Sequence, residues 1–457
     1  MDSGSAAISV DDSVRFQSMD GFGFCEAFQR ARIMRGSRGL TPANQRAVLD
    51  LLFSPTDGAG LSILRLGIGS SADDVYDHMR SIATADPGGP DVPLTYEWDS
   101  DDAGQLWLAR RAHEYGVRQF YACAWSCPGF MMSNRSDIGG GVLCGLPGAP
   151  QDRGDWRPAY AEYLLEYLRC YRREGIKITH LGFVNEPDLF LVKKPHEIPY
   201  AAMQMSPDQV VDFAKLLGQA IDRSGIPVSV VCCDAASWAQ QAVYTSAIEH
   251  DPDAARAVAV HAGHNYYEAA RWRLPTERRV WMSEWEPDVE GNVWRTAWDA
   301  GLREDGMRLA EDIHGALTEA NVSAYLYWFG ASVGGTRALI RLDGQKYNAS
   351  KRLWALAGFS RFVRPGATRM GAFATDPQLK VSVFLNTDGL TVLNVINTSG
   401  REVTASLHTE SRPVSRSLTA YVTDDQRSMA RMPTVHWPAS CPVARFPARS
   451  MTCLVGL

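Results

Sequence analysis

The amino-acid sequence predicts an α/β protein in which a (β/α)8 barrel carries a smaller, packed β-domain. Eight apolar runs recur through the first three-quarters of the 457-residue chain, and amphipathic helical patterns lie between many of them. This alternation is typical of a (β/α)8 barrel. After residue 367 the pattern changes to short segments in which apolar and polar residues alternate, and this change predicts a separate β-rich module.

The eight runs are apolar and β-branched over nearly their whole length. Such runs are typical of strands that are buried on both faces, as in a parallel sheet. An open, doubly wound sheet is the alternative, but a chain with eight such units more often closes into a barrel. The runs cover residues 20–28, 61–70, 118–126, 179–187, 226–237, 257–266, 279–287 and 322–332.

Five segments between these runs have apolar residues at helical spacing. The first begins with Thr41 as a helix N-cap and Pro42 at the first helical position, and the second ends at Gly116, which suits the position after a helix. The five predicted helices cover residues 41–53, 102–116, 156–175, 206–225 and 303–320.

The β-rich end of the chain is predicted to be an antiparallel sandwich or barrel. Residues 6–17 show the same strand pattern before the first barrel strand, so we expect them to pair with this module. The predicted domains are therefore residues 20–367 for the barrel, and residues 1–19 with 368–457 for the side β-domain. The connecting segment, residues 360–367, is compact, so we expect the two domains to pack together.

Composition excludes several classes of function. The net charge is -6 and no basic block occurs, so nucleic acid is not an expected partner. No apolar run is long enough to span a membrane. The first residues lack the charged and apolar regions of a signal peptide, so we expect the mature form of a secreted protein, with a cytoplasmic protein as the alternative. A monomer is expected.

The chain contains nine cysteines. Cys123 and Cys127 have no matching second pair at zinc spacing, so no metal and no cofactor are expected. Most of the cysteines are expected to be buried, unreactive thiols, and the odd count leaves at least one unpaired in a monomer.

Two glutamates end predicted barrel strands. Glu186 follows Asn185 at the end of the fourth strand, and Glu284 follows Ser283 at the end of the seventh. Barrel enzymes have their active sites at these strand ends, and a retaining glycosidase needs two carboxyl groups about 5–5.5 Å apart. Glu186 is predicted to be the acid/base, because a neighbouring anion favours its protonated form. Glu284 is predicted to be the nucleophile.

Further polar side chains stand at strand ends and suit a sugar site. Asn185 is expected to hydrogen-bond a ring 2-hydroxyl. Arg65 ends the second strand and is expected to keep Glu284 ionised, with a structural ion pair as the alternative. His264 is expected to bind a hydroxyl, with a buried core histidine as the alternative.

Aromatic side chains are expected to form the pocket wall, because aromatic faces suit sugar rings. Trp125, Tyr266 and Trp328 end the third, sixth and eighth predicted strands. Glu286 and Asp288 are two further acidic residues close to Glu284 in the sequence. We expect them to lie around the site or in solvent and not to take part in the reaction.

Seven motifs, in order along nearly the whole chain, resemble glycoside hydrolase family 30. The resemblance implies a retaining mechanism, with Glu186 and Glu284 in the roles above, and a side β-domain formed by both chain ends. The motifs are DGFGFCEAFQRA, RLGIGS, FYACAWSCPGFM, HLGFVNEPDL, WMSEWEP, YLYWFGAS and SRFVRPGA.

The resemblance is strongest to a subgroup of fungal and actinobacterial secreted enzymes that includes glucuronoxylan-acting endo-β-1,4-xylanases and xylobiohydrolases. It implies an endo-acting hydrolase of plant cell-wall β-glycan, above all of β-1,4-xylan with glucuronosyl branches. A sister subgroup of endo-β-1,6-galactanases shares much of the same sequence and is the alternative. A non-catalytic carbohydrate-binding protein is a competing class, but it would not need two carboxylates in one barrel mouth. A glucosylceramidase-like enzyme should expose apolar surface for membrane approach.

In the xylanases of this subgroup, an arginine after the first strand binds the carboxylate of a glucuronosyl branch. The resemblance gives this role to Arg30, with Arg32 close by. The alternative is that Arg30 braces its loop through Glu26 or a backbone carbonyl. Family members also have a disulfide near Cys144, but the twelve residues that follow Cys144 here include no second cysteine.

Overall fold

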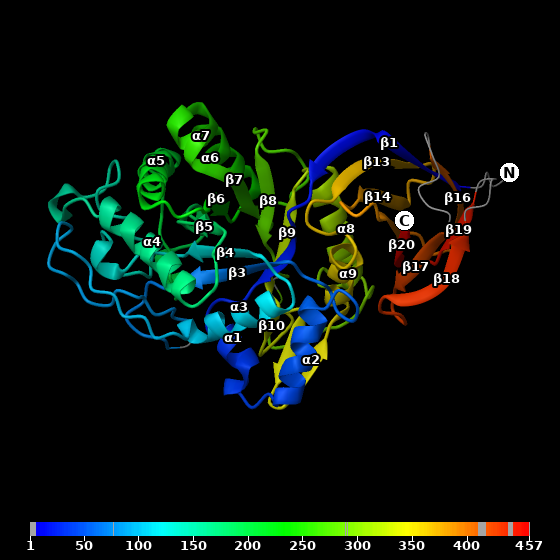
Figure 1. Cartoon of the computed structure of the whole chain (residues 1–457), viewed down its shortest axis with the longest axis horizontal. Coiled ribbons are helices and arrows are strands. Elements are labelled where there is room, and N and C mark those ends of the chain that lie inside the picture. Colours follow the sequence, from blue (N-terminus) through cyan, green and yellow to red (C-terminus); the bar gives the residue numbers. More distant parts are fainter. Residues whose placement is uncertain are drawn as a thin grey trace.

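The computed structural model describes residues 6–75, 77–287, 289, 291–409, 417–436 and 442–456. Asp288, Cys441 and the first five residues of the predicted side domain lie outside these ranges. The chain forms two parts that lie side by side, a larger part on the left of Figure 1 and a β-rich part on the right, which holds the C-terminal strands.

Eight parallel strands close into a barrel in the larger part. Each strand lies within one of the eight predicted runs, and β9 closes the ring by pairing in parallel with β2. The predicted barrel is therefore confirmed, and an open sheet is excluded. The strands are β2 (Gly21–Cys25), β3 (Ile63–Ile68), β4 (Gln119–Ala124), β5 (His180–Gly182), β6 (Ser229–Ala235), β7 (Val258–His264), β8 (Arg279–Glu284) and β9 (Ala324–Phe329).

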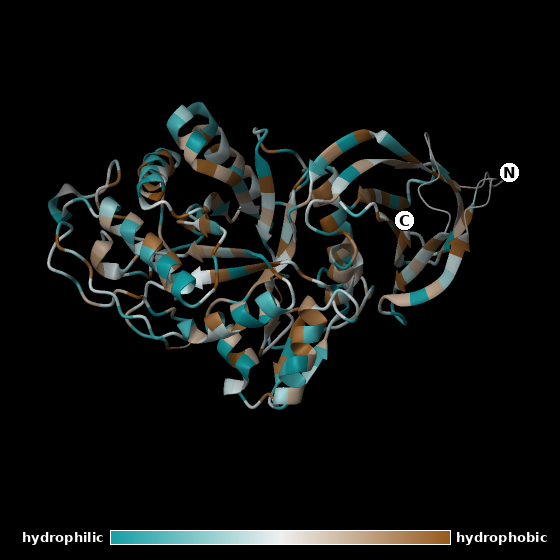
Figure 2. Cartoon of the chain, in the orientation of Figure 1, coloured by the Kyte–Doolittle hydropathy of each residue, from teal (hydrophilic) through white to brown (hydrophobic). Residues whose placement is uncertain are grey.

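Helices surround the barrel, and each carries both apolar and polar residues (Figure 2). Thr41 caps α2 by accepting a hydrogen bond from the Asn44 backbone N–H, with Pro42 at the first position, as predicted. The predicted helix at 102–116 begins later, because Gly104 has a φ of 87° and a left-handed residue interrupts a helix. The helices are α1 (Arg30–Arg32), α2 (Pro42–Phe53), α3 (Gln105–Glu114), α4 (Arg157–Arg173), α5 (Pro207–Ser224), α6 (Trp238–His250), α7 (Pro252–Ala257), α8 (Gly306–Thr318) and α9 (Lys351–Ser360).

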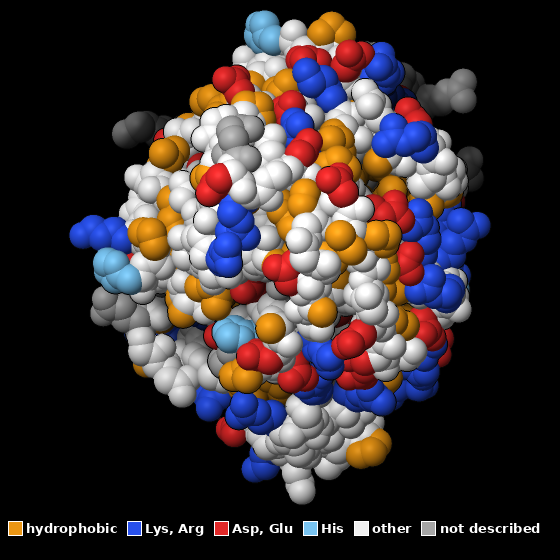
Figure 3. Space-filling view, turned by 90° about the vertical axis from the view of Figure 1, so that its left-hand side faces the viewer, with side chains coloured by type: hydrophobic (Ala, Val, Ile, Leu, Met, Phe, Trp, Pro, Cys, Tyr) orange, Lys and Arg blue, Asp and Glu red, His pale blue; other side chains and the backbone are white. Residues whose placement is uncertain are grey.

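The surface of the barrel end is mixed in charge. Figure 3 shows acidic and basic side chains interspersed on the face that lies at the left of Figure 1. Within the described ranges, no helix combines the length and the hydrophobicity needed to cross a membrane.

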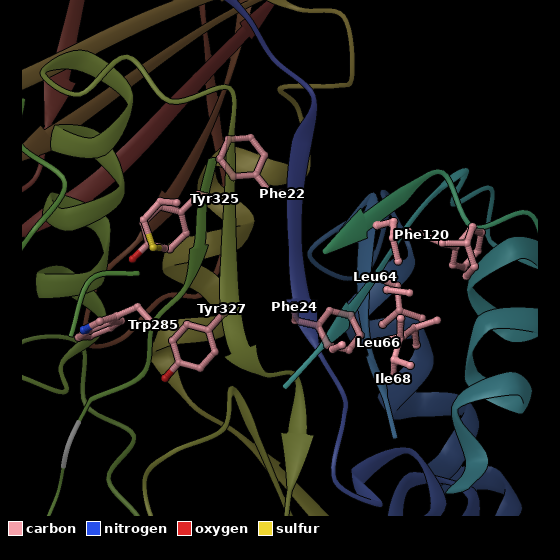
Figure 4. Close-up of a cluster of buried hydrophobic side chains, with 14 of the residues drawn as sticks. Phe22, Phe24, Leu64, Leu66, Ile68, Phe120, Trp285, Tyr325 and Tyr327 are labelled. Carbon is pink, nitrogen blue, oxygen red and sulfur yellow. The ribbon is translucent and has the colours of Figure 1, made fainter. Parts of the chain in front are cut away.

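Side chains on the barrel strands alternate between two apolar clusters, because successive residues of a strand point to opposite faces. Phe24 on β2 and Leu66 on β3 belong to the cluster that the strands share with the surrounding helices (Figure 4). Ile63, Trp281 and Leu326 belong to a separate cluster inside the barrel. The strands are thus buried on both faces, which explains their continuous apolar sequence.

A nine-stranded sheet forms the smaller part. Its first strand, β1, lies inside the sheet, antiparallel to β13 and parallel to β16, so the sheet is mixed rather than purely antiparallel. The sheet encloses its own apolar core, to which strands from both chain ends contribute, and the predicted sandwich-like domain is confirmed. The strands are β1 (Ala6–Ser18), β13 (Thr368–Ala374), β14 (Leu379–Leu385), β15 (Thr391–Asn397), β16 (Val403–Thr409), β17 (Ser417–Thr423), β18 (Ala430–His436), β19 (Val443–Phe446) and β20 (Ser450–Gly456), and a separate small sheet comprises β10 (Ala331–Ser332), β11 (Ile340–Asp343) and β12 (Lys346–Ala349).

The barrel and the nine-stranded sheet pack closely. Arg449 binds both carboxylate oxygens of Asp299, at 2.5 and 2.6 Å, and its carbonyl accepts a hydrogen bond from the Trp298 indole at 2.7 Å. The apolar cluster of the barrel and helices continues into Met451 and Cys453 of β20. The expected packing of the two parts is therefore observed.

We propose that the chain divides into residues 20–367 and residues 1–19 with 368–457, and that neither part is stable alone. Deleting residues 368–457 would remove Tyr421, whose ring centroid lies 4.8 Å from that of Phe362 just after α9, and would remove Met451 and Cys453 from the apolar cluster of the barrel and helices. We expect the truncated chain to aggregate or to melt well below the full chain in a thermal unfolding scan. A soluble truncated enzyme with an unchanged melting temperature would contradict this proposal.

Six cysteines are buried free thiols, as expected, and Cys144 is one of them. Burial raises the pKa of Cys127 well above its ordinary value, so this thiol is unreactive at neutral pH. The adjacent residues Cys232 and Cys233 on β6 form a disulfide, which the sequence analysis did not anticipate.

Candidate active site

The two predicted glutamates lie together at the C-terminal mouth of the barrel. Glu284 is the last residue of β8, and Glu186 stands shortly after β5. Both are buried, with 4% and 8% of their surface exposed. The Glu186 backbone N–H donates to the Asp234 carbonyl at 2.9 Å, which fixes the β5 loop against β6.

The Glu186 and Glu284 carboxylates face each other. One carboxylate oxygen from each glutamate and one ring nitrogen of His264 all lie within 4.8 Å of one another. His264 Nδ1 lies 3.0 Å from Glu186 Oε1. This spacing fits a retaining pair at about 5–5.5 Å, since an inverting pair needs about 6.5–9.5 Å to hold a water molecule.

Arg65 connects several of these groups from the interior of the barrel. Its side chain is fully buried and forms an ion pair with Glu284 Oε2. A second guanidinium nitrogen, Nη2, lies 2.6 Å from Asn185 Oδ1 and 3.1 Å from Asp234 Oδ2. Arg65 thus contacts Glu284 directly, as the sequence analysis expected, and it is also part of a buried ion-pair network.

The three predicted aromatic residues line the same region. The Tyr266 hydroxyl donates to Glu284 Oε1 at 2.8 Å. Trp125 is only 2% exposed, and the Arg65 guanidinium lies over its ring at 4.7 Å. Trp328 lies beside Trp125, with ring centroids 5.6 Å apart. Trp125 therefore supports Arg65, while Tyr266 binds the glutamate itself.

The carboxylates around His264 favour its protonated form. Burial alone would lower its pKa, but Glu284, Asp234 and Glu186 outweigh burial and raise the pKa to about 10. Burial also raises the pKa of Glu284, while His264 and Arg65 oppose this rise. The carboxylates are thus surrounded by fixed positive charge.

Two residues of the site were missed by the sequence analysis. Asp234, fully buried at the end of β6, stands in a predicted strand run, so its position at a strand end was a usable signal. Tyr200 lies in the irregular loop after β5, and burial together with Glu186 and Glu284 raises its pKa. Nothing in the local sequence indicates that Tyr200 reaches the barrel mouth.

Arg30 lies outside this hydrogen-bonded group. Its guanidinium donates to the Phe28 carbonyl at 2.6 Å and pairs with Asp77 at 3.1 Å. Glu26 instead accepts hydrogen bonds from the backbone N–H groups of Gly330 and Ala331. Elsewhere near the barrel mouth, Glu286 pairs with Arg337 at 3.0 Å.

A cation could reach Glu186, His264 and Glu284 together, since their donor atoms are close enough to share one ion. However, Arg65 pairs with Glu284, and the protonated His264 lies beside both glutamates, so two positive charges oppose a bound cation. The donor set therefore suits a neutral sugar better than a metal ion.

Two buried carboxylates that face each other in a barrel mouth define the class of protein as a glycoside hydrolase. The particular family follows from the sequence, because the O-Glycosyl hydrolase family 30 profile matches residues 5–270. The chain belongs to this family, which confirms the predicted resemblance.

Three relatives illustrate the range of similarity. The catalytic domain of the family 30 xylanase C from Talaromyces cellulolyticus superposes with a TM-score of 0.89 at 34% identity, and the match covers 98% of this chain and 99% of that one. Glucuronoxylanase XynC of Bacillus subtilis is 22% identical over 62% of this chain and 61% of its own length. "Putative glucosylceramidase 2" of Caenorhabditis elegans is 25% identical over 84% of this chain and 75% of its own length.

Proposed function

We propose that this protein is a retaining, endo-acting glycoside hydrolase of β-1,4-xylan with glucuronosyl branches. Glu186 is the acid/base and Glu284 the nucleophile. The observation that carries this proposal is the buried, facing pair of glutamates, in which Arg65 and Tyr266 each bind one oxygen of Glu284. Two held oxygens fix the direction from which this carboxylate attacks.

The reaction takes two steps at this pair. Glu186 gives its proton to the glycosidic oxygen while Glu284 attacks the anomeric carbon, so a covalent glycosyl-enzyme forms and the aglycone leaves. Glu186, now a carboxylate, then removes a proton from water, which attacks the same carbon and releases Glu284. Asn185 Oδ1 is bound by Arg65, so its NH2 group is left to donate to the ring 2-hydroxyl.

The proposed substrate is supported by the similarity to xylanase C at 34% identity across nearly the whole chain. We expect glucuronoxylan to give a ladder of oligosaccharides, as an endo-acting enzyme produces, when it is compared with linear arabinoxylan, β-1,6-galactan and aryl β-glycosides. Release of a single short product from chain ends would indicate exo action. Strong hydrolysis of β-1,6-galactan without any hydrolysis of xylan would overturn the substrate proposal and leave the mechanism intact.

We propose further that Arg30 binds the branch carboxylate. The Phe28 carbonyl holds one of its nitrogens, and its partner Asp77 is partly exposed, at 41% of its side-chain surface. The Arg30 side chain is itself only 9% exposed, so a ligand carboxylate would take the place of Asp77 at its guanidinium. An arginine is suited to this contact because its fork binds a carboxylate with two hydrogen bonds.

Replacement of Arg30 by alanine should lower activity on glucuronoxylan about 10- to 150-fold, because a lost charge-assisted contact costs about 1.5–3 kcal/mol. Activity on unbranched xylan should barely change. Arg32→Ala is the matched control, since Arg32 pairs with Asp74 instead. The contact with the Phe28 carbonyl also stabilises the loop. Equal losses of activity on branched and unbranched xylan would therefore show that Arg30 stabilises this loop and does not bind the branch.

Because the proposed substrate is a cell-wall polymer, we propose that a monomer of about 50.3 kDa acts outside the cell. Light scattering of the purified protein and an activity assay of the culture medium test these two points. A stable dimer, or activity confined to the cell extract, would contradict them.

A further inference from the structure

Asp234 is connected to both glutamates of the site. It lies at the end of β6 and is fully buried. Its carboxylate binds Arg65 at 3.1 Å and lies 3.6 Å from His264 Nε2. Its backbone carbonyl accepts the N–H of Glu186 at 2.9 Å. Asp234 therefore contacts Glu186 directly and reaches Glu284 through Arg65.

Three further groups hold the Asp234 carboxylate in place. The hydroxyl groups of Ser283 and Tyr121 each donate a hydrogen bond to it, and the Cys123 thiol lies 3.1 Å away. Gly182 makes room for this arrangement, because a Cβ there would come within 2.5 Å of the Tyr121 hydroxyl. Since Ser283 directly precedes Glu284, this contact also ties the end of β8 to β6.

When Glu186 is in its protonated, acid form, the charges at the barrel mouth balance if Asp234 is ionised. Burial alone would raise the pKa of Asp234, but Arg65 and His264 hold it well below its ordinary value. Arg65 and His264 then carry two positive charges, and Asp234 and Glu284 carry two negative charges. With Glu186 protonated the group is neutral, and without the charge of Asp234 it carries one excess positive charge.

We propose that Asp234 is the positioning residue of this site: its charge keeps His264 an imidazolium and holds Arg65 against Glu284. This inference rests on the proposed roles of Glu186 and Glu284. Asp234 has no exposed surface and therefore acts through its neighbours rather than on the substrate. His264, placed between Glu186 and Asp234, then remains a fixed cation beside the acid/base.

The test is Asp234→Asn in the full-length protein, because asparagine keeps the shape and removes the charge. The ring 15N signals of His264, assigned by comparison with His264→Gln, report its protonation. In the wild type we expect His264 to remain protonated at pH 8. In the variant it should lose its proton at least about one pH unit lower, because the imidazolium then lacks one of the carboxylates that offset its burial.

The kinetics of Asp234→Asn should change in a specific way. We expect kcat to fall about 100-fold while KM stays nearly constant, since Asp234 touches no substrate. The alkaline limb of the pH–rate profile, which reports loss of the catalytic acid's proton, should move to lower pH, because the loss of a buried negative charge favours the deprotonated form of a neighbouring acid. A purely structural role would lower the melting temperature without moving this limb.

Asp20→Asn is the matched control. Asp20 accepts a hydrogen bond from the Trp281 indole at 2.8 Å and pairs with Arg279, at the opposite end of the barrel. This variant also loses an ion-paired carboxylate, and we expect lower stability with unchanged His264 signals and an unchanged pH–rate profile.

Wild-type His264 signals in Asp234→Asn, together with a wild-type pH–rate profile, would overturn the proposal. If the variant does not fold, the ring 15N signals of His264 in the wild type provide the test. A neutral His264 at pH 7 would overturn the proposal, and a protonated His264 at pH 8 would support it. Failure of the proposed function is distinguishable, because it would appear as full activity in Glu284→Gln, while His264 in the wild type and in Asp234→Asn would still titrate as described above.

Discussion

Glu284→Gln is expected to lower kcat by a factor on the order of 10⁴ or more, on both xylan and aryl β-xylosides. The neutral amide cannot attack the anomeric carbon, so the glycosyl-enzyme does not form. The fold should persist, because Arg65 keeps Asp234 and Asn185 as partners. Steady-state kinetics with matched circular dichroism spectra check this result.

Glu277→Gln is the control for this variant, since Glu277 is exposed on the loop between β7 and β8, away from the barrel mouth. It should retain the wild-type rate. Activity of Glu284→Gln within about tenfold of the wild type would remove Glu284 as nucleophile, because the loss of a catalytic nucleophile typically lowers kcat by several orders of magnitude.

Glu186→Ala is expected to separate the two steps. Hydrolysis of xylan should fall by about 10²- to 10⁴-fold, the usual contribution of general acid catalysis. Aryl β-xylosides with good leaving groups should still react with Glu284, because they need no proton. Added azide should then accelerate turnover and yield a β-xylosyl azide, since azide attacks the glycosyl-enzyme without the help of a base.

The configuration of the azide product decides the role of Glu186. A β-azide requires that Glu284 has already inverted the anomeric carbon once. An α-azide, or the absence of any azide effect with activated substrates, would show that Glu186 is not the acid/base of a retaining pair.

Much of the fold could be predicted because the barrel strands are buried on both faces, so that nearly every residue in them is apolar. The ends of the same apolar runs also predicted where the strands end, and therefore the positions of Glu186 and Glu284. The helix pattern was less complete, since residues 265–278 connect β7 to β8 without a helix. The parallel pairing of β1 with β16 joins segments about four hundred residues apart, and no local pattern reports such a pairing.

The network around the glutamates could not be predicted from spacing. Asp234 binds Arg65 across the interior of the barrel, and this contact depends on side-chain directions on β3 and β6. The Trp125 ring faces Arg65, although a tryptophan at a strand end suggests an open sugar platform. Tyr200 reaches the site from an irregular loop. Residue types at strand ends thus identify the reacting groups, but not which groups orient them.

The central claim is that Glu284 forms a covalent intermediate and that the β-configuration is therefore retained. The most direct test follows the anomeric proton signals of the product by NMR in the first minutes of xylooligosaccharide hydrolysis. The proposed mechanism predicts that the β-anomer appears first and then equilibrates with the α-anomer. Initial formation of the α-anomer would contradict it, because inversion requires a water molecule, and not Glu284, to attack the anomeric carbon.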